Sequence, residues 1–165
     1  MLGAHVVLTD RDAGCLSLAE ASIAANEANL RAAGGSVRTV PLDWAWPLGM
    51  PDIPYGEADL VLGSELIYDL ECAQQLPRVI AALLSPNGRF LALMGVHDEK
   101  VNTLDAFFVS ACSAGLELIE EPRALPPSAA ALEWSKGCSH DAEISGSNHR
   151  WSGYIRIEMR LEPHK

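Results

Sequence analysis

Polar and aromatic side chains follow three apolar runs of the sequence, at the point where each run ends. They are Asp10, Asp43, Trp44, Ser64, Glu65 and Tyr68. A carboxylate at a strand end can accept hydrogen bonds from both hydroxyls of a ribose, and an exposed indole can stack on a nucleobase. A glutamate and a tyrosine on one short turn place a carboxylate and a phenol at the same edge. These residue types favour a site for a nucleoside-containing ligand.

Several of these residues also have a purely structural interpretation. Asp10 suits a helix cap or a turn, and Trp44 suits the hydrophobic core. Tyr68 could simply pack against the helix that follows it, and a Glu-x-x-Tyr spacing often occurs by chance. Both interpretations stay open until the elements that carry these residues are considered.

The hydrophobic pattern predicts the elements that must position these residues. Strands are expected at 5–9, 37–42, 58–63, 89–94, 116–120 and 153–161. Helices are expected at 15–32, 72–84 and 100–114, with loops at 45–57 and 122–151. The runs at 5–9 and 58–63 are mostly apolar, as in the strands of a buried parallel sheet. The last strand alternates between apolar and polar residues, as in an antiparallel strand with one exposed face.

This order predicts an α/β fold with an open, mostly parallel sheet and an antiparallel last strand. The turn at 85–88 is expected to end the second helix. Nothing in the chain indicates a linker or an internal repeat, so residues 1–165 are expected to form a single domain. Because ligands of such sheets bind at the carboxyl ends of the strands, we expect the six residues to share one rim.

Charge and hydropathy argue against two classes of partner. Aspartate and glutamate outnumber lysine and arginine by 22 to 12, for a formal net charge of −10. A nucleic-acid-binding protein would need a basic stripe to offset this charge, and the sequence shows none. No apolar run reaches the roughly 18 residues of a membrane span. The sequence does not indicate an oligomeric state.

Cysteine usage and the first residues indicate the compartment. The start of the chain, MLGAHVVLTD, lacks the basic region and cleavage site of a signal peptide. The four cysteines form no C-x-x-C pair, which favours reduced thiols. We therefore expect an intracellular protein, in the cytoplasm with the nucleus as a second compartment.

A cluster in the last loop fits no common zinc motif, so no metal is predicted. It consists of Cys138, His140, Asp141 and His149.

Five segments in the right order resemble methyltransferase family 16, the class I, seven-β-strand protein methyltransferases whose best-known members modify lysine. The segments are LTDRD, NEANL, LDW, GSELIYD and LLSPNGRFLAL. The resemblance runs from residue 3 to about 121, with a fair match in the final strand. It implies a Rossmann-like class I methyltransferase sheet, S-adenosyl-L-methionine as methyl donor, and a protein substrate with a basic acceptor side chain, most often lysine.

The resemblance also implies which residues bind the cofactor. Asp10 matches the acidic residue that holds the ribose hydroxyls in this family. Trp44 matches the tryptophan on the adenine side, and Asp43 precedes it in the LDW segment. Ser64 lies where the family has a small residue in contact with the cofactor. The expected cofactor-binding residues are therefore Asp10, Asp43, Trp44 and Ser64.

Glu65 and Tyr68 match the motif that shapes the pocket for the target side chain, and they are the expected catalytic residues. Methyl transfer needs a neutral amine, whereas a free lysine has a pKa near about 10.4 and must first lose a proton. A carboxylate raises the pKa of a nearby ammonium and so opposes this loss. We therefore assign Glu65 to binding and orientation and leave its role as a base open. Tyr68 could offer an aromatic face to the cation.

One segment of the family pattern is missing. The Gly-rich turn that holds the methionine end of the cofactor should stand upstream of Asp10, and the sequence instead opens on the strand that should be second. This predicts an N-terminally truncated domain. The alternative is a catalytically inactive methyltransferase fold that acts as an interaction module. A nicotinamide-dependent oxidoreductase would need a glycine fingerprint about 20 residues before Asp10 and would not account for the Glu65-x-x-Tyr68 motif.

Overall fold

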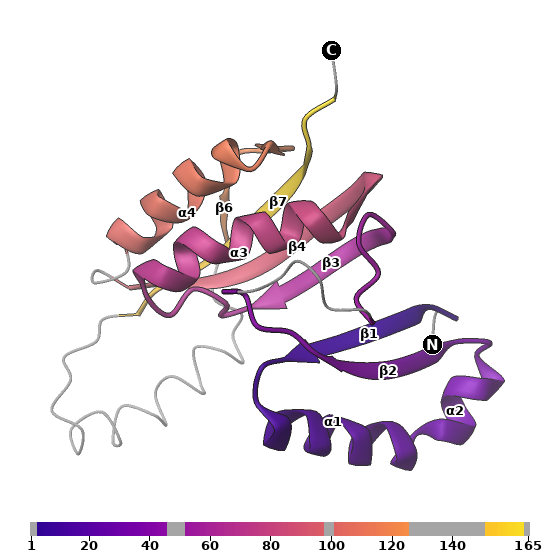
Figure 1. Ribbon diagram of the computed structural model, residues 1–165. Coiled ribbons are helices and arrows are strands. Elements are labelled where there is room, and N and C mark those ends of the chain that lie inside the picture. Colours follow the sequence, from indigo (N-terminus) through magenta and orange to yellow (C-terminus); the bar gives the residue numbers. More distant parts are fainter. Residues whose placement is uncertain (1–2, 46–51, 98–100, 126–150, 164–165) are drawn as a thin grey trace, which may run out of the picture. The chain divides into compact units, whose positions relative to one another are not determined.

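The computed structural model of the protein describes residues 3–45, 52–97, 101–125 and 151–163 (Figure 1). The chain divides into two compact units, Met1–Ile53 and Pro54–Lys165. Whether residues 1–165 behave as a single domain stays a prediction. No helix among the described residues is long and apolar enough to cross a membrane.

The first unit is a two-stranded parallel sheet with a helical crossover. Its elements are β1 (His5–Asp10), α1 (Ala13–Ala25), α2 (Glu27–Ala32) and β2 (Ser36–Pro41). The two strands pair residue for residue along their whole length, and α1 contacts both of them (Figure 1). The half-buried side chains of α1 lie at the i, i+3 and i+7 spacing of one helix face. They are Leu16, Ala19 and Ile23.

The single helix predicted over 15–32 is wrong, because the structure breaks it at Asn26. There the backbone leaves helical geometry, with φ −108° and ψ 6°. The amide Nδ2 of Asn26 donates to the carbonyl of Ser22 at 2.8 Å, and its backbone N–H donates to the carbonyl of Ile23 at 3.0 Å. An asparagine that binds nearby main-chain groups in this way competes with the helix and ends it.

The second unit is a five-stranded sheet. Its strands are β3 (Ala58–Ser64), β4 (Leu84–His97), β5 (Leu116–Leu118), β6 (Arg123–Leu125) and β7 (Trp151–Leu161). The order is β3-β4-β7-β5, with β6 also paired to β7. β3 and β4 are parallel, whereas β7 is antiparallel to its three neighbours. This confirms the predicted antiparallel last strand, while β6 occupies a segment that was expected to be a loop.

Two helices cover one face of this sheet, and the alternation of the strands explains the core. α3 (Leu70–Leu83) and α4 (Val101–Ser113) lie side by side on that face (Figure 1). Phe90 is 1% exposed and its ring lies 6.4 Å from that of Phe107 on α4. Because side chains alternate between the two faces of a strand, every second residue is buried in the central stretches 90–94 of β4 and 157–159 of β7. These residues are Phe90, Ala92, Met94, Ile157 and Met159.

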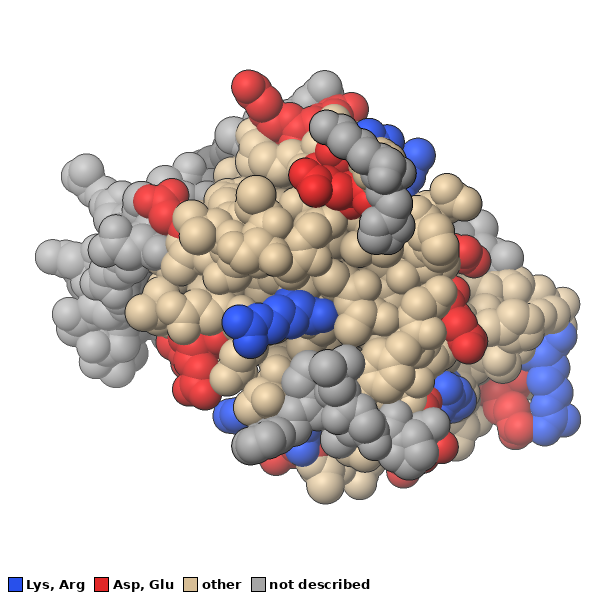
Figure 2. Space-filling model, turned by 45° about the horizontal axis from the view of Figure 1, so that its top comes forward, with Lys and Arg blue, Asp and Glu red and all other residues tan. Residues whose placement is uncertain are grey.

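The other face of the sheet carries charged pairs, two of them between neighbouring strands and one within β7. Glu158 on β7 lies 3.3 Å from the guanidinium of Arg89 on β4 and 2.5 Å from that of Arg156. Arg160 on β7 pairs with Glu117 on β5 at 2.6 Å. On the side of the molecule shown in Figure 2, basic side chains occur in several separate places, with uncharged and acidic residues between them.

The connection from α3 to β4 differs from the prediction. The turn expected at 85–88 is part of β4, because the backbone becomes extended at Leu84, with φ −65° and ψ 133°. The register between the strands shifts here, between Ala58 and Leu60 of β3. A Cβ atom on Gly88 would lie 2.3 Å from the carbonyl oxygen of Ala58. The glycine therefore allows β3 and β4 to approach each other at the shift.

Candidate functional site

Asp10 ends β1 and is exposed. Its Oδ1 atom accepts a hydrogen bond from the backbone N–H of Asp12 at 2.8 Å, which fixes the direction of the carboxylate. The cap of α1 is Asp12, whose side chain accepts from the N–H of Cys15 at 2.9 Å. Asp10 is therefore not the helix cap, and its carboxylate is presented to solvent at the carboxyl end of the strand.

The charge of Asp10 acts on its surroundings. It is the main cause that raises the pKa of the Cys15 thiol, ahead of desolvation and the charge of Asp12. The pKa of Asp12 is lowered, chiefly because the backbone N–H of Cys15 stabilises the carboxylate. The end of β1 is thus a region of negative potential, which suits a ligand that donates hydrogen bonds.

Asp43 and Trp44 follow β2, and both are half-buried. Leu42 is 3% exposed, and its N–H donates to the carbonyl of Asp10 at 3.0 Å. The side chain of Asp43 accepts from the N–H of Ala45 at 2.9 Å and so stabilises the turn that contains Trp44. The first unit therefore brings Asp10, Asp43 and Trp44 together at one end of two paired strands. Trp44 is only partly covered, unlike a core tryptophan.

Ser64, Glu65 and Tyr68 lie at the carboxyl end of β3 in the second unit. Ser64 is exposed and paired with Leu93 of β4. The carboxylate of Glu65 accepts a hydrogen bond from the backbone N–H of Gly95 at 2.6 Å. The side chain of Tyr68 is 66% exposed. That these three residues and the three of the first unit serve one ligand stays a prediction.

Two features of this end of β3 were not predicted from the sequence. One is the backbone N–H of Gly95, which stands 30 positions from Glu65 and gives no signal in the spacing of residue types. The other is Asp69, whose side chain caps α3 by accepting from the N–H of Cys72 at 2.7 Å. An aspartate three residues before the first position of the predicted helix is a typical capping signal and would have indicated this role.

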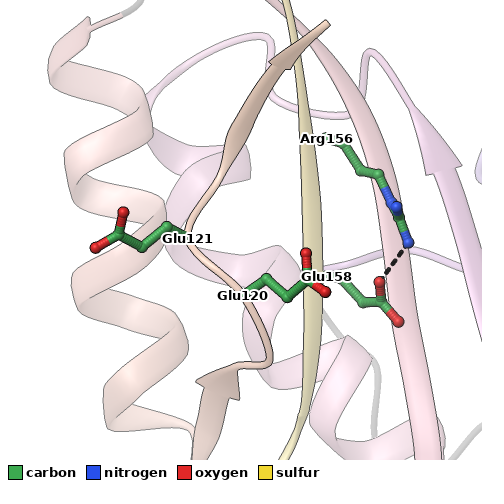
Figure 3. A pocket seen from close by; sticks show the side chains of 4 residues that line it. All are labelled: Glu120, Glu121, Arg156 and Glu158. Carbon is green, nitrogen blue, oxygen red and sulfur yellow. Dashed lines mark hydrogen bonds and ion pairs between the residues drawn. The ribbon is translucent and has the colours of Figure 1, made fainter.

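A small charged pocket lies on the second unit, on the face with the strand-to-strand ion pairs (Figure 3). Its lining residues are Glu120 and Glu121, which follow β5, and Arg156 and Glu158 on β7. The space is about 10 Å³, which is room for roughly one water molecule. It is therefore too small to bind a cofactor or an acceptor side chain.

The cysteine and histidine cluster of the last predicted loop lies outside the described residues. It comprises Cys138, His140, Asp141 and His149. In the part of the chain that the structure describes, no group of three or more His, Cys, Asp or Glu side chains is arranged to hold a metal ion.

A family model described as "Lysine methyltransferase" matches residues 1–112 of the chain. The chain belongs to this lysine methyltransferase family. The match covers all six site residues named above and confirms the resemblance to methyltransferase family 16, whose methyl donor is S-adenosylmethionine. A search of curated protein sequences finds no match.

Solved structures confirm the fold of this family member. The chain is similar to the cyclase SpnF, with a TM-score of 0.62 and 14% identity over 98% of this chain and 74% of that one. It is also similar to a SAM-dependent methyltransferase from Methanosarcina mazei, with a TM-score of 0.62 and 10% identity over 98% of this chain and 84% of that one. The structural similarity shows the class I methyltransferase fold, as predicted. At such low sequence identity it does not show the reaction.

A third structure shows how varied the reactions on this fold are. Geranyl diphosphate C-methyltransferase from Streptomyces coelicolor A3(2), in complex with S-adenosyl-L-homocysteine, has a TM-score of 0.63 to the chain. The identity is 13%, over 96% of this chain and 64% of that one. Because this neighbour is named for methyl transfer to a small molecule, the shared fold does not by itself identify the acceptor.

Proposed function

We propose that the chain is an S-adenosylmethionine-dependent protein methyltransferase that acts on the Nζ atom of lysine. Family membership supports methyl transfer to lysine. The observation that carries the proposal is the Glu65-x-x-Tyr68 motif at the carboxyl end of β3, where Tyr68 is 66% exposed on a turn anchored to the sheet. An exposed aromatic ring on an anchored turn suits the recognition of a cationic side chain.

The first unit supplies the adenosine side of the proposed cofactor site. Asp10 fits this role, because it is exposed and one of its carboxylate oxygens is already held by the main chain. A carboxylate in this position can accept charge-assisted hydrogen bonds from ribose hydroxyls. Trp44, half-buried beside Asp43, is proposed to contact the adenine. Ser64 is proposed to contact the cofactor from the second unit.

The proposed cofactor supplies a methyl group on a sulfonium, and the residues of the chain must deliver a neutral amine to it. A lysine with a pKa near about 10.4 is almost entirely protonated at neutral pH. Its ammonium can be bound by the face of Tyr68 before it loses the proton. Alignment of the amine by such a side chain removes much of the entropic barrier to reaction. Glu65 and Tyr68 are therefore proposed to shape the acceptor pocket.

A protein with accessible lysines is the proposed partner. The formal net charge of −10 attracts basic segments and raises the rate at which they are encountered. The proposed compartment is the cytoplasm, with the nucleus as a second one, and fluorescence imaging of the tagged chain in cells tests it.

The test of the cofactor site is isothermal titration of the chain with S-adenosylhomocysteine. We expect binding by the wild type. Because hydrogen bonds to a charged group contribute about 1.5–3 kcal/mol, Asp10→Asn should weaken binding by roughly 10- to 100-fold. The control Asp105→Asn changes an exposed carboxylate on α4 and should leave binding unchanged. Equal affinities of the wild type and Asp10→Asn would contradict the proposed site.

An interaction module with the same fold is the second candidate. The fold alone does not decide between the two candidates, because one fold can host many functions. A folded wild-type chain, with the circular dichroism of an α/β protein, that takes up no S-adenosylhomocysteine in the titration would favour this candidate over the enzyme.

A further inference from the structure

Glu65 has an unusual backbone conformation. Its φ of 54° is the only positive φ of a non-glycine residue within the described part of the chain. The left-handed region disfavours residues with a Cβ atom and persists only where the surrounding structure holds it. Contacts of Glu65 must therefore compensate for this conformation at the point where β3 ends.

The side chain of Glu65 takes the place of its own carbonyl group in the sheet. In a regular parallel ladder, one residue donates its N–H to the neighbouring strand and accepts, through its carbonyl, the next N–H of that strand. The N–H of Glu65 donates to the carbonyl of Leu93 at 3.0 Å, as in such a ladder. The next donor, the N–H of Gly95, is bound at 2.6 Å by the carboxylate of Glu65. The chain can thus leave the sheet while this buried N–H stays satisfied.

The residues after Glu65 hold the turn 65–69 at further points. Leu66 lies over Gly63, so closely that a Cβ atom on Gly63 would be 2.0 Å from its Cδ1 atom. Ile67 is 1% exposed. Asp69 is bound to the first turn of α3 as its cap. Tyr68 is the large side chain of this turn that remains mostly exposed.

We propose that Glu65 is a positioning residue: its carboxylate fixes the main chain of β4 at Gly95 and thereby the turn that presents Tyr68 to the acceptor. This inference rests on the proposed function, and it reassigns Glu65 from contact with the ammonium to support of Tyr68. The carboxylate is engaged by a short, charge-assisted bond to the main chain. An amide oxygen can accept the same bond, so Glu65→Gln should preserve the arrangement, whereas it would remove the negative charge that attracts an ammonium.

The first experiment does not depend on activity. Amide hydrogen exchange at Gly95 is measured by NMR in the full chain and in its variants. In Glu65→Ala, loss of the bond should raise the exchange rate of the Gly95 amide about tenfold or more. In Glu65→Gln, that rate should stay within about threefold of the wild-type rate. Glu65→Gly also removes the bond but adopts a positive φ without strain, so it tests the bond even where Glu65→Ala does not fold. Glu57→Ala, an exposed glutamate before β3, is the control.

The second experiment measures methyl transfer from labelled S-adenosylmethionine to poly-L-lysine. If Glu65 is a positioning residue, the kcat/KM of Glu65→Gln should stay within about threefold of the wild-type value. Glu65→Ala and Glu65→Gly should lose about tenfold or more in kcat/KM, mainly through a lower kcat. A Glu65→Gln variant that loses as much activity as Glu65→Ala, with Gly95 still protected, would show that the charge contacts the acceptor and overturn the proposal. Absence of transfer by the wild type would reject the proposed function. In that case the exchange rate of the Gly95 amide still tests the positioning role of Glu65 independently of activity. An unchanged rate in Glu65→Ala would refute that role.

Discussion

Substitution of Gly63 by alanine tests whether the turn 65–69 is held against β3. A Cβ atom there would lie 2.0 Å from Cδ1 and 2.8 Å from Cγ of Leu66, well inside van der Waals contact. The side chain of Leu66 must therefore leave its position, by a change of rotamer or by a movement of the turn. Overpacking of this kind costs about 1–3 kcal/mol. Since about 1 kcal/mol shifts the melting temperature of a chain of this size by roughly 2–4 °C, we expect Gly63→Ala to melt about 2–12 °C lower.

The matched control is the double variant Gly63→Ala/Leu66→Ala, compared with Leu66→Ala alone. Truncation of the half-buried Leu66 should cost about 1–2 kcal/mol, below the range of fully buried leucines. Because truncation also makes room for the new Cβ atom, the double variant should be more stable than the sum of the single effects by at least about 0.5 kcal/mol. Urea denaturation measures all three. Strictly additive effects, or a Gly63→Ala chain as stable as the wild type, would refute this packing of the turn.

Two further predictions concern the end of β1. The folded chain holds the pKa of Asp12 below its ordinary value of 3.8. The stabilisation by this cap is therefore present above that pH and is lost as the pH falls through the lower folded pKa. The stability difference between wild type and Asp12→Asn, followed by urea denaturation from pH 7 to 2, should shrink in that window, and a constant difference would contradict the cap. Separately, Asp10→Asn removes the main cause that raises the pKa of the Cys15 thiol. Iodoacetamide should then alkylate Cys15 faster at pH 8, as measured by peptide mass spectrometry, and an unchanged rate would argue against their proximity.

The site residues could be identified from the sequence because their signals are local. Each follows a strand, and strands are visible as short apolar runs between turns. The structure confirms that Asp10 ends β1, that Asp43 and Trp44 follow β2, and that Ser64 ends β3. In the second helix, the i, i+3 and i+4 spacing of Leu76, Val79 and Ile80 matches the face that is buried in α3. Leu83, which continues this spacing, is only half-buried.

Some local predictions failed where side chains compete with the backbone. The helix expected over 15–32 breaks at Asn26, since an asparagine amide can bind either solvent or a nearby carbonyl and the hydrophobic pattern cannot distinguish the two.

The strand β6 was also missed. It pairs with β7, a partner that is distant along the chain. A three-residue strand is too short to give a periodic signal of its own.

The sequence by itself indicated the family, the succession of most helices and strands along the chain and the residue types at the strand ends, because these depend on neighbouring positions. Only the tertiary structure decided what the carboxylate of Glu65 binds. The parallel register of β3 and β4 brings the N–H of Gly95 to it across 30 positions. A glutamate that looks like a ligand for a cation in the sequence is thus, in the folded chain, a support for the tyrosine three residues later.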